Sequence, residues 1–313
     1  MSGLFTFGET LALLTSPKIG ALSHQSSLDL SIGGAESNTA IAVSRLGGLS
    51  TWLGRISTDS LGELIHNSIR AEGVRVLTVN DPGPMSLMIK DRRSAISTDI
   101  HYWRQIGPGS RLSPNDIPED ELRHSQVLHI TGITPALSDT AREAVFAAVE
   151  IAADAGVTVS FDVNFRSRLW SREQAAPVLR DLARKADVIF VGDDELHCLI
   201  DTTADLAIAA AEISSWGPRE VIIKRGSQGA TVFTDGTITE RPALTVPVLD
   251  TVGAGDAFAG GYLTELMLKR DIDTRLATAV ACGAWAVTGA GDWESTPRRS
   301  DLSRLASLGG VVR

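Results

Sequence analysis

The feature that most constrains the fold is a regular alternation of short apolar segments and longer helical segments, which begins near residue 125. The apolar segments are rich in Val, Ile and Phe, which favour strands. Alternation of this kind predicts βαβ units and a parallel sheet with helices on both faces, and right-handed crossovers leave few topologies. The segments are QVLHI (126–130), SDTAREAVFAAVEIAADAG (138–156), VTVSFDV (157–163), SREQAAPVLRDLARKA (171–186), DVIFVG (187–192), TADLAIAAAEISSWG (203–217) and EVIIKRG (220–226).

The first third of the chain departs from this alternation. Residues 36–48 and 60–73 predict helices, and the N-terminal stretch 1–17 predicts a strand. Four short stretches predict antiparallel strands with little helix to cover them: LALLTSP (11–17), SLDLSIGG (27–34), SLMIKDRR (86–93) and STDIHYWRQI (97–106). We therefore expect one α/β domain over 1–313, with a small β lid formed by about 11–32 and 85–108, and the Pro-rich stretch 113–122 marks the return to the body.

Composition excludes several classes of protein. The net charge of −9 argues against a general nucleic-acid binder, which needs a surplus of cations. The two cysteines, Cys198 and Cys282, are far apart and form no C-x-x-C, so they predict neither a disulfide framework nor a zinc site. The most apolar helical stretches are interrupted by charge, so none is expected to span a membrane. The N-terminus has no cationic start followed by a long apolar run, and we expect a cytoplasmic protein.

The segment LDTVGAGDAFAGGYL (249–263) joins a glycine-rich turn to a buried helix. Gly253 and Gly255 allow a sharp turn, and the free N–H groups of the helix start form an anion site with the helix dipole. Asp256, in the first turn, could accept the proton of an attacking hydroxyl while these groups stabilise a transferring phosphoryl group. Spacing alone leaves open that Asp256 only stabilises the helix. The apolar stripe that predicts this helix is Phe258, Tyr262, Leu263, Leu266 and Met267.

Two other phosphate-binding motifs can be tested directly. The sequence G-x-x-x-x-G-K-[ST] of a P-loop does not occur. A dinucleotide-binding fingerprint needs a third glycine or alanine where Phe258 stands, and it usually opens a domain rather than following several βα units. Both alternatives therefore fail, and an NAD-dependent oxidoreductase is disfavoured with them.

With Asp250 and Thr251, the GAGDAF segment resembles the C-terminal signature of the ribokinase-like (PfkB-type) carbohydrate kinases. The N-terminal signature, GGAESNTA (33–40) continuing through AVSRLGG to Gly54, is also present. The resemblance covers essentially the whole chain. It implies a Rossmann-type α/β body with a β lid, ATP as the phosphoryl donor and Mg²⁺. Asp256 is then the general base, with Gly253, Ala254 and Gly255 beside the phosphoryl group and Gly33, Gly34 and Asn38 against the sugar.

Further polar residues directly follow predicted strands, and the carboxyl ends of parallel strands are where ligands bind in open α/β sheets. The resemblance implies that Lys224 to Gly229, including Gly226 and Ser227, form the nucleotide-binding loop, and that Asn164 and Arg166 contact ATP, the sugar or both. Glu195 resembles the acid of an N-x-x-E element that organises Mg²⁺ through water. Gly192 stands at the asparagine position, so Asp193 and Asp194 are alternative acids.

Three segments are similar to 2-keto-3-deoxygluconate kinases: Glu9 in FGETLALLTSP, HYWRQIGPGSRLSPNDI, and LHITGITPALS with DVNFRSRLW. A sugar acid carries a carboxylate, which a guanidinium binds at two points, so Arg104 and Arg166 are its candidate ligands. Arg166 would suit a phosphate equally well. The resemblance adds Tyr102 and Asp292 as substrate contacts. Met88 stands where this subgroup often has a tyrosine, and a thioether cannot donate a hydrogen bond.

The sequence therefore predicts an ATP-dependent sugar kinase that phosphorylates a primary hydroxyl group, with 2-keto-3-deoxy-D-gluconate as the expected substrate. A fructokinase-like or other hexose or ketose kinase is the first alternative. A catalytically silent sugar or nucleotide sensor on the same fold is the second. An exposed edge of the lid would favour a homodimer.

Overall fold

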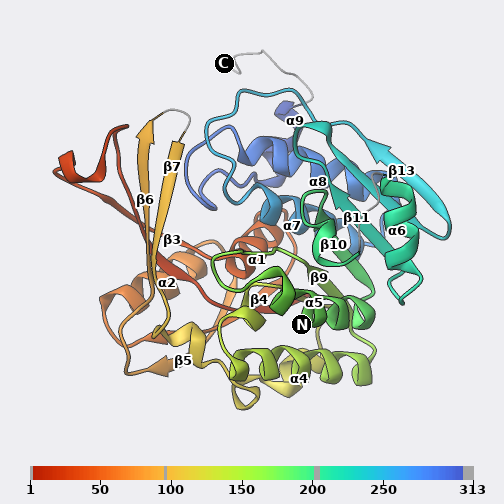
Figure 1. Cartoon of the computed structure of the whole chain (residues 1–313), viewed down its shortest axis with the longest axis horizontal. Helices are drawn as coiled ribbons and strands as arrows, with labels where there is room; N and C mark the ends of the chain where they lie inside the picture. Colours follow the sequence, from red (N-terminus) through yellow and green to blue (C-terminus); the bar gives the residue numbers. More distant parts are fainter. Residues whose placement is uncertain (1–2, 95–96, 201–204, 306–313) are drawn as a thin grey trace.

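The computed structural model describes residues 3–94, 97–200 and 205–305 and contains two sheets (Figure 1). The larger has the order β13-β12-β11-β10-β9-β8-β1-β4-β5, and its strands from β11 to β5 are parallel. This confirms the predicted parallel sheet. The strands are β1 (Leu4–Phe7), β4 (Ser50–Ser57), β5 (Arg75–Asp81), β8 (Val127–Thr131), β9 (Thr158–Asp162), β10 (Val188–Gly192), β11 (Glu220–Lys224), β12 (Ala230–Thr234) and β13 (Thr237–Arg241).

Helices cover both faces of this sheet, as predicted. Alternate residues of β10 point to opposite sides: Ile189 and Val191 pack in one apolar cluster, and Val188 and Phe190 pack in another. The first cluster includes α4 (Asp139–Ala155), α5 (Arg172–Lys185) and α6 (Leu206–Ser214). The second includes α1 (Ala35–Arg45), α7 (Ala254–Met267) and α8 (Ile272–Ala286). The helix predicted over 203–217 begins at Leu206, and its first two predicted residues lie outside the described ranges.

The remaining helices lie at the periphery. They are α2 (Ser60–Ala71), which packs on β4 and β5, and the short α3 (Glu119–Arg123) and α9 (Arg299–Leu305). Among the described residues, no helix combines the length and apolar character needed to cross a membrane.

The edge hairpin of β12 and β13 was not predicted, and both strands are antiparallel to their neighbours. Asp235 and Gly236 connect them with positive φ angles of 49° and 73°. An Asp-Gly pair between two β-rich segments is a strong hairpin signal because both central turn residues need φ above zero. The sequence contained this signal in ATVFTDGTITER.

The second sheet has four strands in the order β3-β2-β6-β7 and projects from the body, as Figure 1 shows. Its strands are β2 (Leu11–Thr15), β3 (Asp29–Gly33), β6 (Leu87–Ser94) and β7 (Ser97–Trp103), and residues 95–96 lie outside the described ranges. We call it the small sheet. The lid strand predicted at 11–17 is β2, whereas the strand predicted for the N-terminal stretch 1–17 contains a second strand, β1, which belongs to the body.

The expectation of purely antiparallel pairing in the small sheet was wrong. The central pair, β2 and β6, is parallel, whereas β2–β3 and β6–β7 are antiparallel. The chain enters the sheet from the body at β2 and again at β6, and it turns back through β3 and β7. Two strands that leave the body in the same direction run parallel when they are neighbours.

Candidate active site

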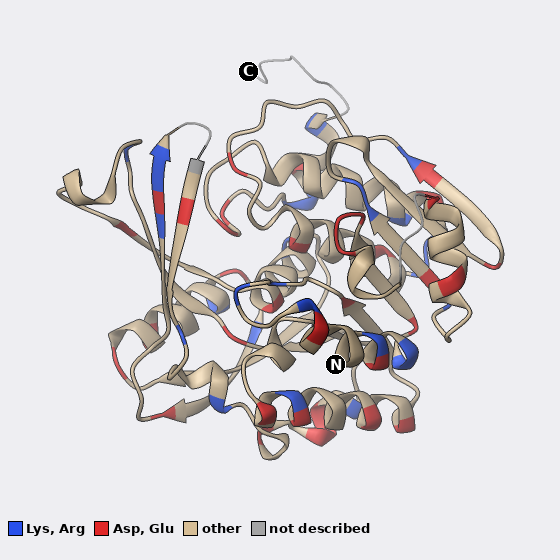
Figure 2. Ribbon diagram, in the orientation of Figure 1, with Lys and Arg blue, Asp and Glu red and all other residues tan. Residues whose placement is uncertain are grey.

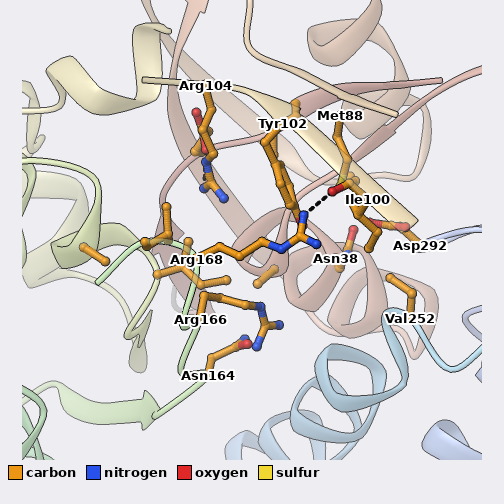
Figure 3. A pocket seen from close by; sticks show the side chains of 18 of the residues that line it. Asn38, Met88, Ile100, Tyr102, Arg104, Asn164, Arg166, Arg168, Val252 and Asp292 are labelled. Atoms are coloured by element: carbon orange, nitrogen blue, oxygen red, sulfur yellow. Dashed lines mark hydrogen bonds and ion pairs between the residues drawn. The ribbon is translucent and has the colours of Figure 1, made fainter. Parts of the chain in front are cut away.

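A cleft of about 2000 Å³ lies between the small sheet and the body. The sheet contributes residues of β2, β6 and β7, and the body contributes the loops after β9, β10 and β11 and the first turns of α1 and α7. Figure 3 shows arginine, asparagine and tyrosine side chains from these elements converging on it. Of the predicted site residues, the lining includes Gly33, Gly34, Asn38, Met88, Tyr102, Arg104, Asn164, Arg166, Glu195, Lys224, Gly226, Gly253, Gly255, Asp256 and Asp292.

Asp256 lies in the first turn of α7, as predicted. Gly253, the residue before the helix, has φ 74°, and a Cβ there would lie 1.7 Å from the carbonyl oxygen of Asp292, so only glycine fits. The Asn38 side-chain amide donates a 2.9 Å hydrogen bond to the Asp256 carboxylate. Burial raises the pKa of Asp256 to about 7, the bond from Asn38 opposes this rise, and the charge of Asp162 adds to it. A carboxyl with such a pKa suits general base catalysis near neutral pH.

Two strand ends form an ion pair beside this helix start. Lys224, at the end of β11, places Nζ 2.8 and 2.7 Å from the two carboxylate oxygens of Asp162, at the end of β9. Asp162 is buried, and Lys224 Nζ would lie 3.6 Å from a Cβ added at Gly255. The ammonium therefore faces the N-terminus of α7, where an anion would sit. Asp162 was not among the predicted site residues, although it directly precedes the predicted Asn164 segment at the carboxyl edge of the sheet.

The loop after β9 carries the other predicted body residues. Asn164 is buried with φ 40°, a conformation that a non-glycine residue adopts at some energetic cost and that is common at functional sites. Arg166 is exposed to the cleft and lowers the pKa of Asp256. Arg168, which was not predicted, crosses the cleft and donates a hydrogen bond to the Ile100 carbonyl of β7 (Figure 3).

Arg104 has a partner within the protein. It forms an ion pair with Glu9, which is buried and also accepts a 2.7 Å hydrogen bond from Ser86. The Arg104 guanidinium lies 5.4 Å from the ring centre of Tyr102. Its charge is therefore largely compensated by Glu9, which makes it a weaker candidate for a substrate carboxylate than Arg166 or Arg168.

Asp292 and the two glycines of the first signature meet at the base of the small sheet. A Cβ on Gly33 would lie 2.3 Å from an Asp292 carboxylate oxygen, and one on Gly34 would lie 2.5 Å from the Glu9 carbonyl. The backbone contact requires glycine at position 34, whereas a side chain at position 33 would displace the Asp292 carboxylate. Burial raises the pKa of Asp292, and the ammonium of Lys90, 2.5 Å from its Oδ1, opposes that rise. Lys90 was not predicted, because nothing in the sequence links a lid strand to residue 292.

The predicted nucleotide loop divides into two parts. Lys224 and Gly226 line the cleft, whereas Ser227 and Gly229 do not, and neither does Ala254 of the GAGD turn. Gly229 has φ 97°, and a Cβ there would lie 2.0 Å from the Arg241 carbonyl oxygen. Glycine at this position therefore allows the end of β13 to pack closely against the backbone at the start of β12.

The carboxylate of Glu195 is already occupied by backbone groups. Its two oxygens accept hydrogen bonds of 2.8 Å from the N–H groups of Phe165 and Gly192. Burial raises the pKa of Glu195, and the charge of Lys224 opposes that rise. In the described part of the chain, no three His, Cys, Asp or Glu side chains are grouped so that they could hold a metal ion. Each oxygen of this carboxylate can still accept one more hydrogen bond, and Glu195 lines the cleft.

Comparisons with known proteins agree with this geometry. The sequence model that describes the pfkB family carbohydrate kinases matches residues 1–299 of this chain. The chain is 32% identical to the 2-dehydro-3-deoxygalactonokinase of Haloferax volcanii over 92% of both chains, and 32% identical to the 2-dehydro-3-deoxygluconokinase of Bacillus subtilis over 98% of this chain and 96% of that one. It is also 30% identical to the probable fructokinase-3 of Arabidopsis thaliana, over 97% of this chain and 91% of that protein.

A solved structure supports the fold and the nucleotide. A putative ribokinase II from E. coli, in complex with ATP and Mg²⁺, superposes with a TM-score of 0.91 at 26% identity, covering 98% of this chain and 99% of that chain. The described cleft combines a carboxylate, a helix N-terminus and a lysine, which is the set that phosphoryl transfer requires. The chain belongs to the pfkB family of carbohydrate kinases and is an ATP-dependent phosphotransferase acting on a sugar hydroxyl group.

Proposed function

We propose that this kinase phosphorylates the primary hydroxyl group of a 2-keto-3-deoxy sugar acid, and that its substrate is 2-keto-3-deoxy-D-gluconate, which it converts to the 6-phosphate. The observation that carries the proposal is the pair Arg166 and Arg168. Both line the cleft and are exposed to it, and within the described ranges neither forms an ion pair with a carboxylate. Two guanidinium groups without a paired carboxylate suit a substrate that brings its own carboxylate.

The chain's own residues divide the work of phosphoryl transfer. Asp256 accepts the proton of the attacking hydroxyl, and Asn38 orients its carboxylate. The N–H groups at Gly253 and Gly255 and the ammonium of Lys224 stabilise negative charge on the transferring group. The small sheet acts as a lid that excludes water from the cleft. Mg²⁺, when bound with ATP, would neutralise phosphate charge, with Glu195 as its water-mediated contact.

The raised pKa of Asp256 predicts the pH dependence of the reaction. The base works only when deprotonated, so kcat/KM should rise about tenfold per pH unit below about 7 and level off above it. Initial rates between pH 5 and 9, with saturating Mg·ATP, measure this. A profile that is flat from pH 5 to 8 would show that Asp256 is not titrating in the rate-limiting step.

The test of the sugar-acid proposal is Arg166→Met, with kinetic constants measured separately for the sugar acid and for ATP. Loss of a charge-assisted bidentate contact should lower kcat/KM for the sugar acid roughly 10- to 100-fold. KM for ATP should stay within about threefold. Arg172→Met, at the exposed start of α5 and outside the cleft, is the matched control. A rise confined to KM for ATP would assign Arg166 to phosphate and count against the proposal.

The pairing of Arg104 with Glu9 favours a second candidate, an uncharged ketose such as fructose. With that guanidinium compensated and Met88 on the cleft wall, this side of the cleft is less cationic than the sequence predicted. Arg104→Ala does not separate the two candidates, because it would leave Glu9 buried and unpaired whichever sugar binds. Arg166 and Arg168 are the informative positions.

We also propose a cytoplasmic homodimer joined through the small sheet. Leu30 on β3 and Trp103 on β7, the two edge strands of this sheet, are 50% and 57% exposed, and exposed edge strands favour association. Light scattering tests the proposal: a monomer mass at micromolar concentration would contradict it.

A further inference from the structure

Lys90 is a buried lysine that the proposed mechanism does not use. It lies on β6, a strand on which Figure 2 shows several basic residues. The Lys90 residue is only 2% exposed. Its Nζ lies 2.5 Å from Oδ1 of Asp292 and 3.5 Å from Oδ2 of Asp250. Lysines are almost never this deeply buried unless they are paired. Both partners belong to the body, so the ion pairs cross from the small sheet to the body.

Asp292 joins this lysine to the anion site. Its carbonyl oxygen packs against Gly253, where an added Cβ would lie 1.7 Å away, and its carboxylate packs against Gly33 at the end of β3. One residue therefore contacts two strands of the small sheet and Gly253, the residue before α7. Displacing the Asp292 side chain would move the backbone that holds Gly253 in place.

Asp250 gives a second connection to the same site. Its Oδ1 accepts a 3.1 Å hydrogen bond from the N–H of Val252, and its Oδ2 accepts one of 3.5 Å from the N–H of Gly291. The second bond ties residues 250–252, which precede Gly253, to residues 291–292, which pack against it. The ammonium of Lys90 thus lies between two carboxylates that both shape the start of α7.

An ion pair that only stabilised the fold would not need to lie beside the start of α7, as the pairs of Lys90 do. Arg93, on the same strand, pairs with Asp99 of β7 at 3.8 Å, and both side chains are about half exposed. That pair lies within the small sheet, and neither residue lines the cleft. It serves as an internal comparison for Lys90.

We propose that Lys90 is a positioning residue for phosphoryl transfer, which fastens the small sheet to the two segments that shape the anion site at the start of α7. The anion site then has its productive geometry only while the small sheet covers the cleft. This would make transfer depend on lid position and would limit loss of ATP to water. This inference rests on the kinase activity but not on any particular sugar. If the sugar-acid proposal fails, the role proposed for Lys90 still stands.

The experiment is Lys90→Met, which keeps an unbranched side chain one atom shorter and removes the charge. It uses whichever sugar the wild-type enzyme phosphorylates. A misplaced anion site should lower kcat roughly 10- to 100-fold, with KM for both substrates within about threefold. The ratio of ADP released to sugar phosphate formed, close to one in the wild type, should rise at least about twofold. Arg93→Met should match the wild type in kcat and in this ratio.

A structural role alone gives a different result. Folded Lys90→Met enzyme, judged by near-ultraviolet circular dichroism, would then have a lower melting temperature but a wild-type kcat and ratio, which would overturn the proposal. If Lys90→Met does not fold, Lys90→Gln is measured instead: its amide keeps a polar group at this buried position, but it is uncharged and one bond shorter, so it cannot hold both Asp292 and Asp250. A wild-type kcat and ratio in that variant would equally overturn it, and a reduced kcat with excess ADP would support it.

Discussion

Replacement of Asp256 by Asn should lower kcat by about 10²- to 10⁴-fold without unfolding the enzyme, since general base catalysis contributes this much. The variant keeps the size of the side chain, and the new amide oxygen can still accept the hydrogen bond that Asn38 donates. What it loses is the ability to take a proton from the sugar hydroxyl. Steady-state rates with saturating ATP and sugar, together with a thermal melt, measure both parts of this expectation.

The matched control is Asp273→Asn. Asp273 is also an acidic residue in the first turn of a helix, α8, but it is exposed and lies outside the cleft. It should lose only the small helix-dipole stabilisation, about 0.3–1 kcal/mol, and no activity. If both variants behaved alike, Asp256 would have only the structural role that its position in the helix permits.

Replacement of Lys224 by Met should lower kcat/KM about 10²- to 10³-fold, the usual cost of removing one electrostatic contact to the transition state. The same change leaves Asp162 buried without its partner, which should also lower the free energy of unfolding by about 3–5 kcal/mol. Activity and stability are therefore expected to fall together in this single variant.

The double variant Asp162→Asn/Lys224→Met separates the two effects. Without the uncompensated carboxylate, most of the stability should return, while activity should remain low. Arg225→Met is the positional control, because the Arg225 guanidinium turns away from the cleft towards Glu240 and Gln228. Recovery of activity along with stability in the double variant would show that Lys224 acts only by holding β9 and β11 together.

The sequence predicted the body of this protein well because its signals are local. Each βα unit carries its own strand and helix pattern, and Gly156 ends α4 with φ 70°, as a terminal glycine should. The glycine turn before Asp256 is likewise a local signal. The β12–β13 hairpin was not predicted, although the pair Asp235 and Gly236 is a local signal for it. The parallel pairing of β2 with β6 has no local signal, because it depends on how the chain enters the small sheet twice.

The site was harder to predict wherever a residue acts through a distant partner. Lys90 and Asp292, Asp162 and Lys224, and Glu9 and Arg104 are each far apart in the sequence, and only the fold brings the members of a pair together. The motifs placed the reacting groups at the cleft. They could not show which arginines are already compensated, and this is the property that bears on the substrate.

The measurement that tests the central claim most directly is ADP release with Mg·ATP across a panel of five sugars: 2-keto-3-deoxygluconate, 2-keto-3-deoxygalactonate, gluconate, fructose and ribose. The account predicts turnover chiefly with the keto-deoxy acids, with kcat/KM about 10- to 100-fold above that for fructose, as one good charge-assisted contact allows. Turnover chiefly with fructose or ribose would leave Asp256 as the base and contradict the sugar-acid assignment.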